Sequence, residues 1–214
     1  MNIRLAIFDF DGTLADTFPF FVSVHNTLAE RYQFRSIGHE EIDALRHHGA
    51  REVMRQVGLP RWKFPFVARA FMKLMKAEQS GIALFDGVEA ALAELAASGT
   101  VLAVVSANSY DNIVRILGPQ AAAHFRYFEC GVSMFGKTRR LKRVLKLSGV
   151  AAHEAMYIGD QKTDLEAAHD AGMAFGAVAW GYAHLVSMRK LGVEREFHTV
   201  AELGGLALPA QVAA

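Results

Sequence analysis

Four aspartates lie in two short segments that could bring carboxylate chemistry to one place. Asp9 and Asp11 are separated by one residue in the segment 9–14, and Asp160 and Asp164 lie together in the segment 159–164. Carboxylates that are held close together repel one another, which raises their pKa values unless a cation compensates. Magnesium suits such a set, because it binds few carboxylates together with waters and substrate phosphate oxygens. The aspartates therefore predict a Mg²⁺ site that handles a phosphorylated ligand.

The types of residue available favour phosphoryl transfer as the reaction. A carboxylate beside a metal can attack phosphorus and form an aspartyl-phosphate. A second carboxylate two residues further on can protonate the leaving oxygen and then deprotonate the attacking water. Ser106, Asn108 and Lys137 could bind the phosphoryl oxygens and offset their developing charge.

Short apolar runs must position these residues. Each run is typical of a strand buried on both faces, and a helical pattern follows each of the last three. The runs cover residues 5–8, 101–105, 156–158 and 174–179. Strands that alternate with helices in this way predict an open, mostly parallel, Rossmann-like α/β sheet. Ligands bind such sheets beyond the carboxyl ends of the strands, where Asp9, Ser106 and Asp160 all lie.

Residues 17–84 follow a different pattern. They contain no comparable strand, and residues 18–32 read as a helix. Val67, Phe71, Leu74 and Met75 mark a second apolar helical stripe. We therefore predict an α/β core made of residues 1–16 and 85–214, with residues 17–84 inserted as a helical domain.

Composition argues against several other classes of protein. The 214 residues carry 23 basic and 22 acidic side chains, so no single-sign field exists to attract nucleic acid or an anionic membrane. The N-terminus reaches Asp9 too soon for a signal peptide, and every apolar run is too short to span a membrane. The single Cys130 cannot form an internal disulfide, which fits a reducing compartment. We expect a soluble, cytoplasmic protein that binds neither nucleic acid nor membrane; the sequence leaves its oligomeric state open.

The chemical segments resemble the motifs of the haloacid-dehalogenase-like (HAD) hydrolases. Residues 9–14 look like the first motif of that family, and Ser106 matches the second. Lys137 matches the third motif and residues 159–164 match the fourth, in the family's order over nearly the whole chain. Residues 167–172 and 180–182 are similar to the phosphoglycolate-phosphatase-like branch, which carries a cap domain where the helical insert lies.

This resemblance implies roles for the first motif. Asp9 would be the nucleophile and a metal ligand. Asp11 would be the general acid and base, with its backbone carbonyl on the metal. Because the dehalogenases of the family lack this second aspartate, Asp11 favours a phosphatase that acts on a small phosphorylated metabolite.

The resemblance also implies roles for the other motifs. Ser106 and Lys137 would hold the phosphoryl group. Asp160 would ligate Mg²⁺ directly or through water, and Asp164 would support the metal or orient Lys137.

A few further residues are candidate substrate contacts. They are Gly12, Thr13, Asn108 and Arg51. Arg46 and Arg51 lie near the place where a cap loop of the family reads the substrate, and an arginine could hold a carboxylate or a second phosphate by two parallel hydrogen bonds. Solvated helix charges are the alternative at these two positions, and a turn residue is the alternative for Asn108.

Residues 131–138 also fit the P-loop pattern of nucleotide-binding proteins. Too few residues follow Thr138 to build a nucleotide-binding core, and a P-loop leaves the segment 9–13 unexplained. We therefore favour a phosphatase in which Lys137 belongs to the active site. A phosphomutase of the β-phosphoglucomutase type that uses the same aspartate, and a non-catalytic protein that binds a phosphorylated ligand, are the alternatives.

Overall fold

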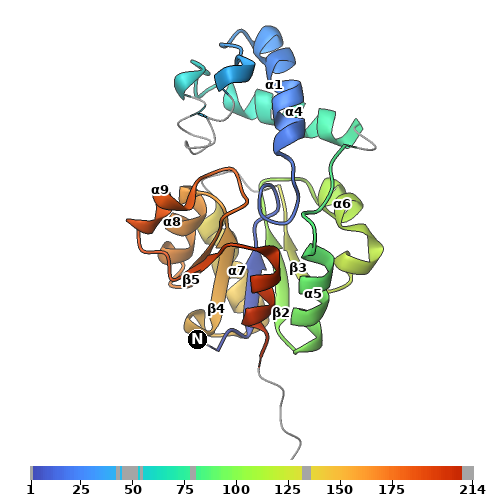
Figure 1. Cartoon of the computed structure of the whole chain (residues 1–214), viewed down its shortest axis with the longest axis vertical. Helices are drawn as coiled ribbons and strands as arrows, with labels where there is room; N and C mark the ends of the chain where they lie inside the picture. Colours follow the sequence, from blue (N-terminus) through green and yellow to red (C-terminus); the bar gives the residue numbers. More distant parts are fainter. Residues whose placement is uncertain are drawn as a thin grey trace, which may run out of the picture.

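The computed structural model describes residues 2–41, 44, 53, 55–77, 81–131 and 136–208. The chain forms an α/β core, and a smaller group of helices stands over one end of the core's sheet (Figure 1). The group of helices comes from the chain between the first strand and the rest of the core.

A six-stranded parallel sheet, in the order β3-β2-β1-β4-β5-β6, forms the centre of the core. Its strands are β1 (Leu5–Phe8), β2 (Val101–Val105), β3 (Phe125–Glu129), β4 (Ala155–Gly159), β5 (Ala174–Val178) and β6 (Arg195–Phe197). The first strand is central, with Leu5 opposite both Val101 and Ala155. Every residue of β1 and β4 is buried, because helices cover both faces of the sheet. The predicted parallel α/β core is confirmed.

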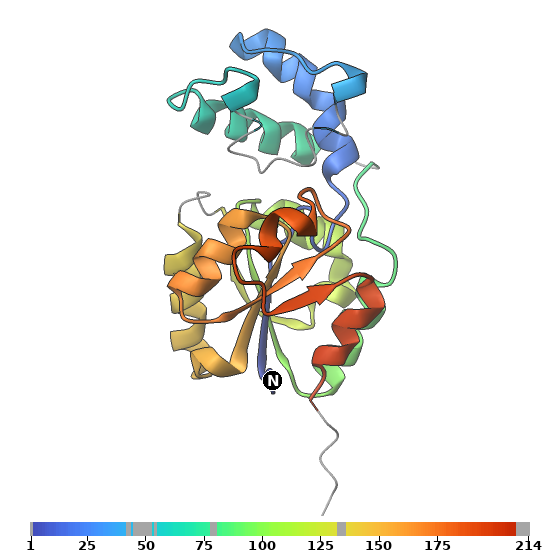
Figure 2. The same ribbon diagram turned by 60° about the vertical axis from the view of Figure 1, so that its left-hand side comes forward.

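Helices cover the two faces of the sheet and give the core three layers (Figure 2). One layer contains α7 (Lys137–Ser148), α8 (Lys162–Asp170) and α9 (Leu185–Arg189). The other contains α5 (Val88–Ala97), α6 (Tyr110–Ala122) and the 3-10 helix η3 (Val200–Leu206). Successive residues of β1 point to opposite faces of the sheet. Ile7 packs in the hydrophobic cluster with α7 and α8, and Phe8 packs in the hydrophobic cluster with α5 and α6. A short 3-10 turn, η2 (Ala152–Glu154), leads into β4. None of the described helices is long and apolar enough to cross a membrane.

The inserted helices form a small aromatic core of their own, and we call this part the cap. It contains α1 (Phe18–Tyr32), the 3-10 turn η1 (His39–Glu41) and α4 (Phe64–Ala77), so both predicted helices are present. Phe71 of α4 lies between Phe20 and Phe21 of α1, with ring centroids 5.4 and 6.2 Å apart. The described residues of the cap contain no strand. The boundaries predicted at residues 17 and 84 stay a prediction.

Two linkers join the cap to the core, and they run side by side. The backbone N–H of Asp16 donates to the carbonyl of Ala83 at 2.9 Å, and that of Phe85 donates to Leu14 at 3.0 Å. An isolated antiparallel bridge joins Ala15 to Leu84 between them. The chain therefore enters and leaves the cap through two adjacent, hydrogen-bonded linkers.

Candidate active site

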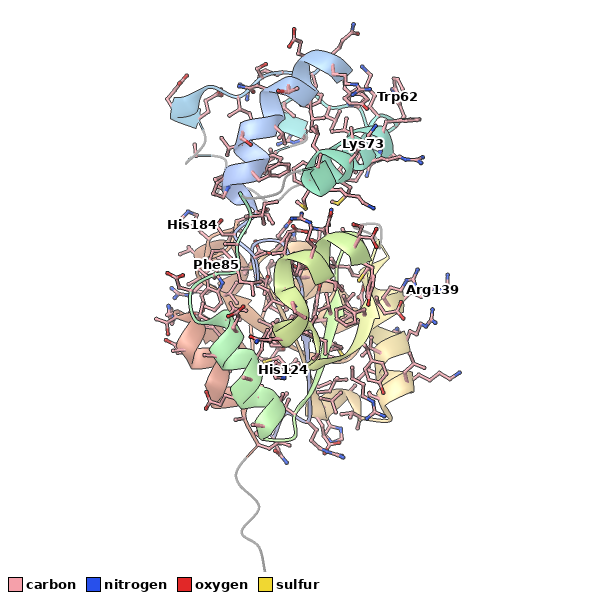
Figure 3. The ribbon with its side chains drawn as sticks, turned by 90° about the vertical axis from the view of Figure 1, so that its right-hand side faces the viewer. Trp62, Lys73, Phe85, His124, Arg139 and His184 are labelled. Carbon is pink, nitrogen blue, oxygen red and sulfur yellow. The ribbon has the colours of Figure 1, made fainter. Side chains whose placement is uncertain are left out.

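The carboxyl ends of three neighbouring strands bring the predicted residues to one edge of the sheet. Asp9 follows β1 and continues its ladder, because its N–H donates to Ile158 of β4 at 2.8 Å. Ser106 follows β2, and Asp160 follows β4. Figure 3 shows the cap standing over this edge, while Trp62 points outward from the cap. The site therefore lies where the core faces the cap.

A buried lysine joins two of the aspartates. Lys137 begins α7, and its Nζ lies 2.7 Å from Oδ2 of Asp9 and 2.6 Å from Oδ1 of Asp164. All three side chains are almost fully buried. Burial lowers the pKa of Lys137, but the charges of Asp164 and Asp9 outweigh it and hold that pKa well above its ordinary value. The lysine is therefore a fixed positive charge in the site.

The two carboxylate oxygens of Asp160 differ in their hydrogen bonding. The backbone N–H of Tyr182 donates to Oδ2 at 2.6 Å. The other oxygen, Oδ1, is buried and has no hydrogen-bond partner among the described residues. Burial, followed by the charges of Asp164 and Asp9, raises the pKa of Asp160 well above its ordinary value. A buried oxygen of this kind is costly unless another group satisfies it.

A divalent cation fits this arrangement. Carboxylate oxygens of Asp9, Asp160 and Asp164 lie within 4.8 Å of one another. Three such oxygens are hard donors of the type that Mg²⁺ prefers, and a cation would satisfy the unpartnered oxygen of Asp160. The carboxylate of Asp11, which the resemblance links to the metal through its backbone carbonyl, lies outside this cluster of described side chains.

Asp164 is held from several sides. Besides Lys137, its Oδ2 accepts the N–H of Gln161 at 3.1 Å at the start of α8. The hydroxyl of Tyr157 lies 3.3 Å from Oδ1 and 2.9 Å from the carbonyl oxygen of Val105. Burial raises the pKa of Asp164 to about 6, against the opposing effect of Lys137. This carboxylate is therefore placed to orient the lysine and to support a cation at once.

Asp11 sits beside the cluster and has a different environment. Its carboxylate oxygens accept hydrogen bonds from Nδ2 of Asn108 at 3.0 and 3.2 Å. Burial, and next the charge of Asp9, raise the pKa of Asp11 to about 7, while hydrogen bonds from Thr17 and Asn108 oppose the shift. The hydroxyl of Thr17 in turn bonds to that of Tyr182. A carboxyl group with a pKa of about 7 can both give and take a proton near neutral pH.

Ser106 and Asn108 lie on the turn between β2 and α6. Both are buried, and the hydroxyl of Ser106 accepts the backbone N–H of Asn108 at 3.2 Å. The side-chain amide of Asn108, predicted to contact substrate, donates to Asp11 and to the sulfur of Met75. A substrate contact by Asn108 stays a prediction.

Gly12 and Thr13 belong to the turn that follows Asp11, and Gly12 packs against Asp160. Gly12 has a φ of +77°, and a Cβ at this position would lie 2.5 Å from Oδ2 of Asp160, so only glycine fits. The hydroxyl of Thr13 is buried without a hydrogen-bond partner among the described residues. The indole N–H of Trp180 donates to the carbonyl of Thr13 at 3.0 Å and fixes the turn.

Two predicted features fall outside the described residues. They are the cap arginines Arg46 and Arg51, and the middle of the P-loop-like segment at residues 132–135. The lysine of that segment, Lys137, lies in the aspartate cluster.

Several residues of the site were not predicted from the sequence. Tyr157 was read only as part of an apolar strand, although a hydroxyl on a fully buried strand needs a partner. Glu129 ends β3 and forms ion pairs with Arg140 at 2.6 Å and with Arg143 at 3.1 Å. Because both arginines belong to α7, Glu129 ties this helix, and hence Lys137, to the sheet. The many basic residues in the sequence of α7 could have indicated a buried acidic partner for this helix.

The sequence of this chain is similar to those of known hydrolases. The sequence model of the haloacid dehalogenase-like hydrolases matches residues 6–178. A phosphoglycolate phosphatase of Synechococcus elongatus is 31% identical over 181 residues, which cover 84% of this chain and 85% of that protein. A phosphoglycolate phosphatase of Xanthomonas campestris pv. campestris is 29% identical over 190 residues, covering 84% of each chain.

Solved structures share the fold. A hydrolase of the haloacid dehalogenase-like family from Streptococcus pneumoniae superposes with a TM-score of 0.77 at 19% identity, over 94% of this chain and 97% of that one. CbbY from Rhodobacter sphaeroides, solved with phosphate, has a TM-score of 0.70 at 23% identity, over 94% and 96% of the two chains. The predicted family is confirmed: the chain belongs to the haloacid dehalogenase-like hydrolases.

Proposed function

We propose that this protein is a Mg²⁺-dependent phosphatase that hydrolyses a small phosphomonoester through an aspartyl-phosphate on Asp9. The observation that carries the proposal is the buried bridge from Asp9 through Lys137 to Asp164, beside the unpartnered oxygen of Asp160. Phosphatase chemistry also agrees with the relatives that are 31% and 29% identical over most of the chain, both of them phosphatases.

The first step forms the covalent intermediate. A carboxylate oxygen of Asp9 attacks phosphorus, and the bond from phosphorus to the leaving oxygen breaks. Asp11 gives its proton to that oxygen, so the product leaves as an alcohol. Lys137 and Ser106 hold the phosphoryl oxygens and offset their negative charge.

The second step regenerates the enzyme. Asp11, now ionised, takes a proton from a water molecule as the water attacks the phosphoryl group on Asp9. The bond between phosphorus and the Asp9 oxygen breaks, and inorganic phosphate leaves. The pKa of about 7 suits Asp11 to both proton transfers.

Asp9, Asp160 and Asp164 would hold the metal ion, with the Asp11 backbone carbonyl as a further ligand implied by the family resemblance. When bound, Mg²⁺ supplies positive charge close to the phosphoryl oxygens. Asp160 would contribute Oδ1, which has no hydrogen-bond partner in the part of the chain that the structure describes.

Phosphoglycolate is the first substrate to test, because it is the substrate named for both relatives. The cap would close over the core, exclude bulk water and admit only certain leaving groups. Gly12, Thr13 and Asn108, together with Arg51 from the cap, are the proposed substrate contacts, and the proposed setting is the cytoplasm.

A hydrolysis screen over phosphate esters with Mg²⁺ tests the proposal. Wild type should release inorganic phosphate from at least one alkyl ester, and Asp9→Asn should release none. Acid quenching should trap a phosphoryl group on wild type and not on Asp9→Asn. Activity that survives Asp9→Asn would refute the nucleophile, and an isomerised sugar phosphate in place of inorganic phosphate would identify a mutase.

A further inference from the structure

Asn108 has an amide group whose orientation is fixed by its neighbours. Its Oδ1 accepts the backbone N–H of Ser109 at 2.8 Å and Nδ2 of Asn112 at 3.1 Å. Both of these groups are donors, so the oxygen of the Asn108 amide must face them. The nitrogen therefore faces Asp11, and it donates to both oxygens of that carboxylate.

The same nitrogen also contacts the cap. Sδ of Met75, in α4, lies 3.1 Å from Nδ2 of Asn108, and Met75 is fully buried. An amide nitrogen has two hydrogens, so one can bond to Asp11 and the other can point to the sulfur, which is a weak acceptor. Asn108 thus lies between the proposed general acid of the core and one side chain of the cap.

The backbone of α4 rests on α6 at the same place. Nη2 of Arg115 donates to the carbonyl oxygen of Met75 at 2.9 Å. Nδ2 of Asn112 lies 3.5 Å from the carbonyl oxygen of Met72, one helical turn earlier. Arg115 therefore satisfies one of the carbonyl groups that the end of a helix leaves without intrahelical partners, because Met75 lies in the last turn of α4. This contact sets the position of Met75 over Asn108.

We propose that Asn108 is a positioning residue that orients the carboxyl group of Asp11. Met75 supports this orientation by covering the Asn108 amide when α4 rests on α6. With Met75 in place, the Asn108 amide is shielded from water, and a hydrogen bond to a carboxylate is stronger in such a setting. With the cap away from α6, water competes for the amide, and Asn108 orients Asp11 less firmly. The inference rests on the proposed function, in which Asp11 protonates the leaving group.

Two esters with different leaving groups separate positioning from general damage. An alkyl phosphate such as phosphoglycolate needs a proton on its leaving oxygen, whereas p-nitrophenyl phosphate releases a stable anion without one. The value of kcat/KM reports the steps up to departure of the leaving group. Asn108→Ala should lower kcat/KM for the alkyl ester about tenfold or more, within the roughly 10²–10⁴-fold that general acid catalysis contributes. For p-nitrophenyl phosphate it should change kcat/KM by less than about threefold, because no proton is needed.

The ratio of the two kcat/KM values is the readout, because it does not depend on the fraction of enzyme that is folded. Asn108→Ser provides the same test should the alanine variant fail to fold. Asn26→Ala is the matched control, since among the described residues the Asn26 amide bonds only within the cap, to the backbone of Ile37. This control should leave the ratio unchanged. An equal loss on both esters in the Asn108 variants would overturn the inference.

The contribution of the cap is tested with Met75→Leu, which removes the sulfur and nearly conserves the volume. As a single substitution, Met75→Leu should lower the ratio of kcat/KM for the alkyl ester to kcat/KM for p-nitrophenyl phosphate a few-fold. Added to Asn108→Ala, it should not lower this ratio further. Fully additive effects would overturn the link through Asn108. Wild type that hydrolyses neither ester, or that is unaffected by Asp9→Asn, would instead refute the proposed function itself.

Discussion

The core and the cap are built in opposite ways. In the core site, charged groups are buried and paired, with Lys137 between Asp9 and Asp164 at 2.7 and 2.6 Å. In the cap, aromatic rings pack around Phe71, and charged pairs such as Arg35 with Glu41 are exposed. Buried charges need partners at fixed positions, whereas water solvates the exposed charged pairs of the cap. Under the proposed function, the core carries the chemistry and the cap controls access to it.

Removal of metal should give the largest effect, and it should act on the core alone. Chelation with EDTA should reduce activity at least about 10³-fold, since the buried carboxylates then repel one another and the phosphoryl oxygens lose their cation. Mg²⁺ should restore the activity and raise the melting temperature of the protein. Asp160→Asn should abolish the thermal shift. A cap variant that abolished it as well would break the distinction between the two regions.

Lys137→Met should come next. The loss of a fixed positive charge at the phosphoryl group should lower kcat about 10²–10³-fold, as for the removal of one stabilising donor from an oxyanion site. Tight binding of ATP by wild type, lost in this variant and without any phosphatase activity, would revive the P-loop reading. Calorimetry with ATP beside the hydrolysis assay distinguishes the two results.

A change inside the cap should have a smaller and more selective effect. Phe20 is buried and packs on Phe71, so Phe20→Ala should weaken the packing of the cap. It should lower kcat/KM for an alkyl phosphate ester about tenfold. The affinity for Mg²⁺, measured by thermal shift, should stay within about twofold of wild type. Loss of metal binding here would show that the cap also builds the core site.

The smallest expected effect is a pH-dependent change in the stability of the metal-free protein. The pKa of Asp11 is about 7 in the folded state and about 3.8 when unperturbed, so between these values the folded state binds more protons. The free energy of unfolding therefore falls as the pH rises from about 4 to about 7, and the whole of this loss is present above pH 7. Asp11→Asn removes this cost, so it should raise the melting temperature by about 2 °C or more at pH 8, and the gain should shrink towards pH 4. A gain of equal size at both pH values would contradict the burial of an ionised Asp11.

The parts of the fold that depend on short segments of sequence could be predicted. The apolar runs before Asp9, Ser106 and Asp160 predicted three strands, and the rule for parallel sheets predicted that their ends would meet. The short strand β6 was not predicted, because Arg195–Phe197 is brief and carries charged residues at the edge of the sheet.

The contacts between distant segments could not be predicted in the same way. The bond from Asn108 to Met75 joins the turn before α6 to α4, and the relative placement of these segments depends on side-chain packing, for which the sequence has no local signal. The same holds for Glu129, whose arginine partners are identifiable only once α7 is docked on β3. The Tyr182 backbone contact to Asp160 depends likewise on the path of the loop after β5.

The central place of β1 in the sheet has a consequence for how the chain folds. β1 bonds to β2 on one side and to β4 on the other, and the entire cap lies in the chain between β1 and β2. Pairing of these strands must close a long loop, which costs entropy before any contact repays it and slows folding. The hydrogen bonds within each helix of the cap are local, so these helices can form before any long loop is closed. We therefore expect the cap to gain helical structure early in refolding, while the strand that carries Asp9 is fixed in place late.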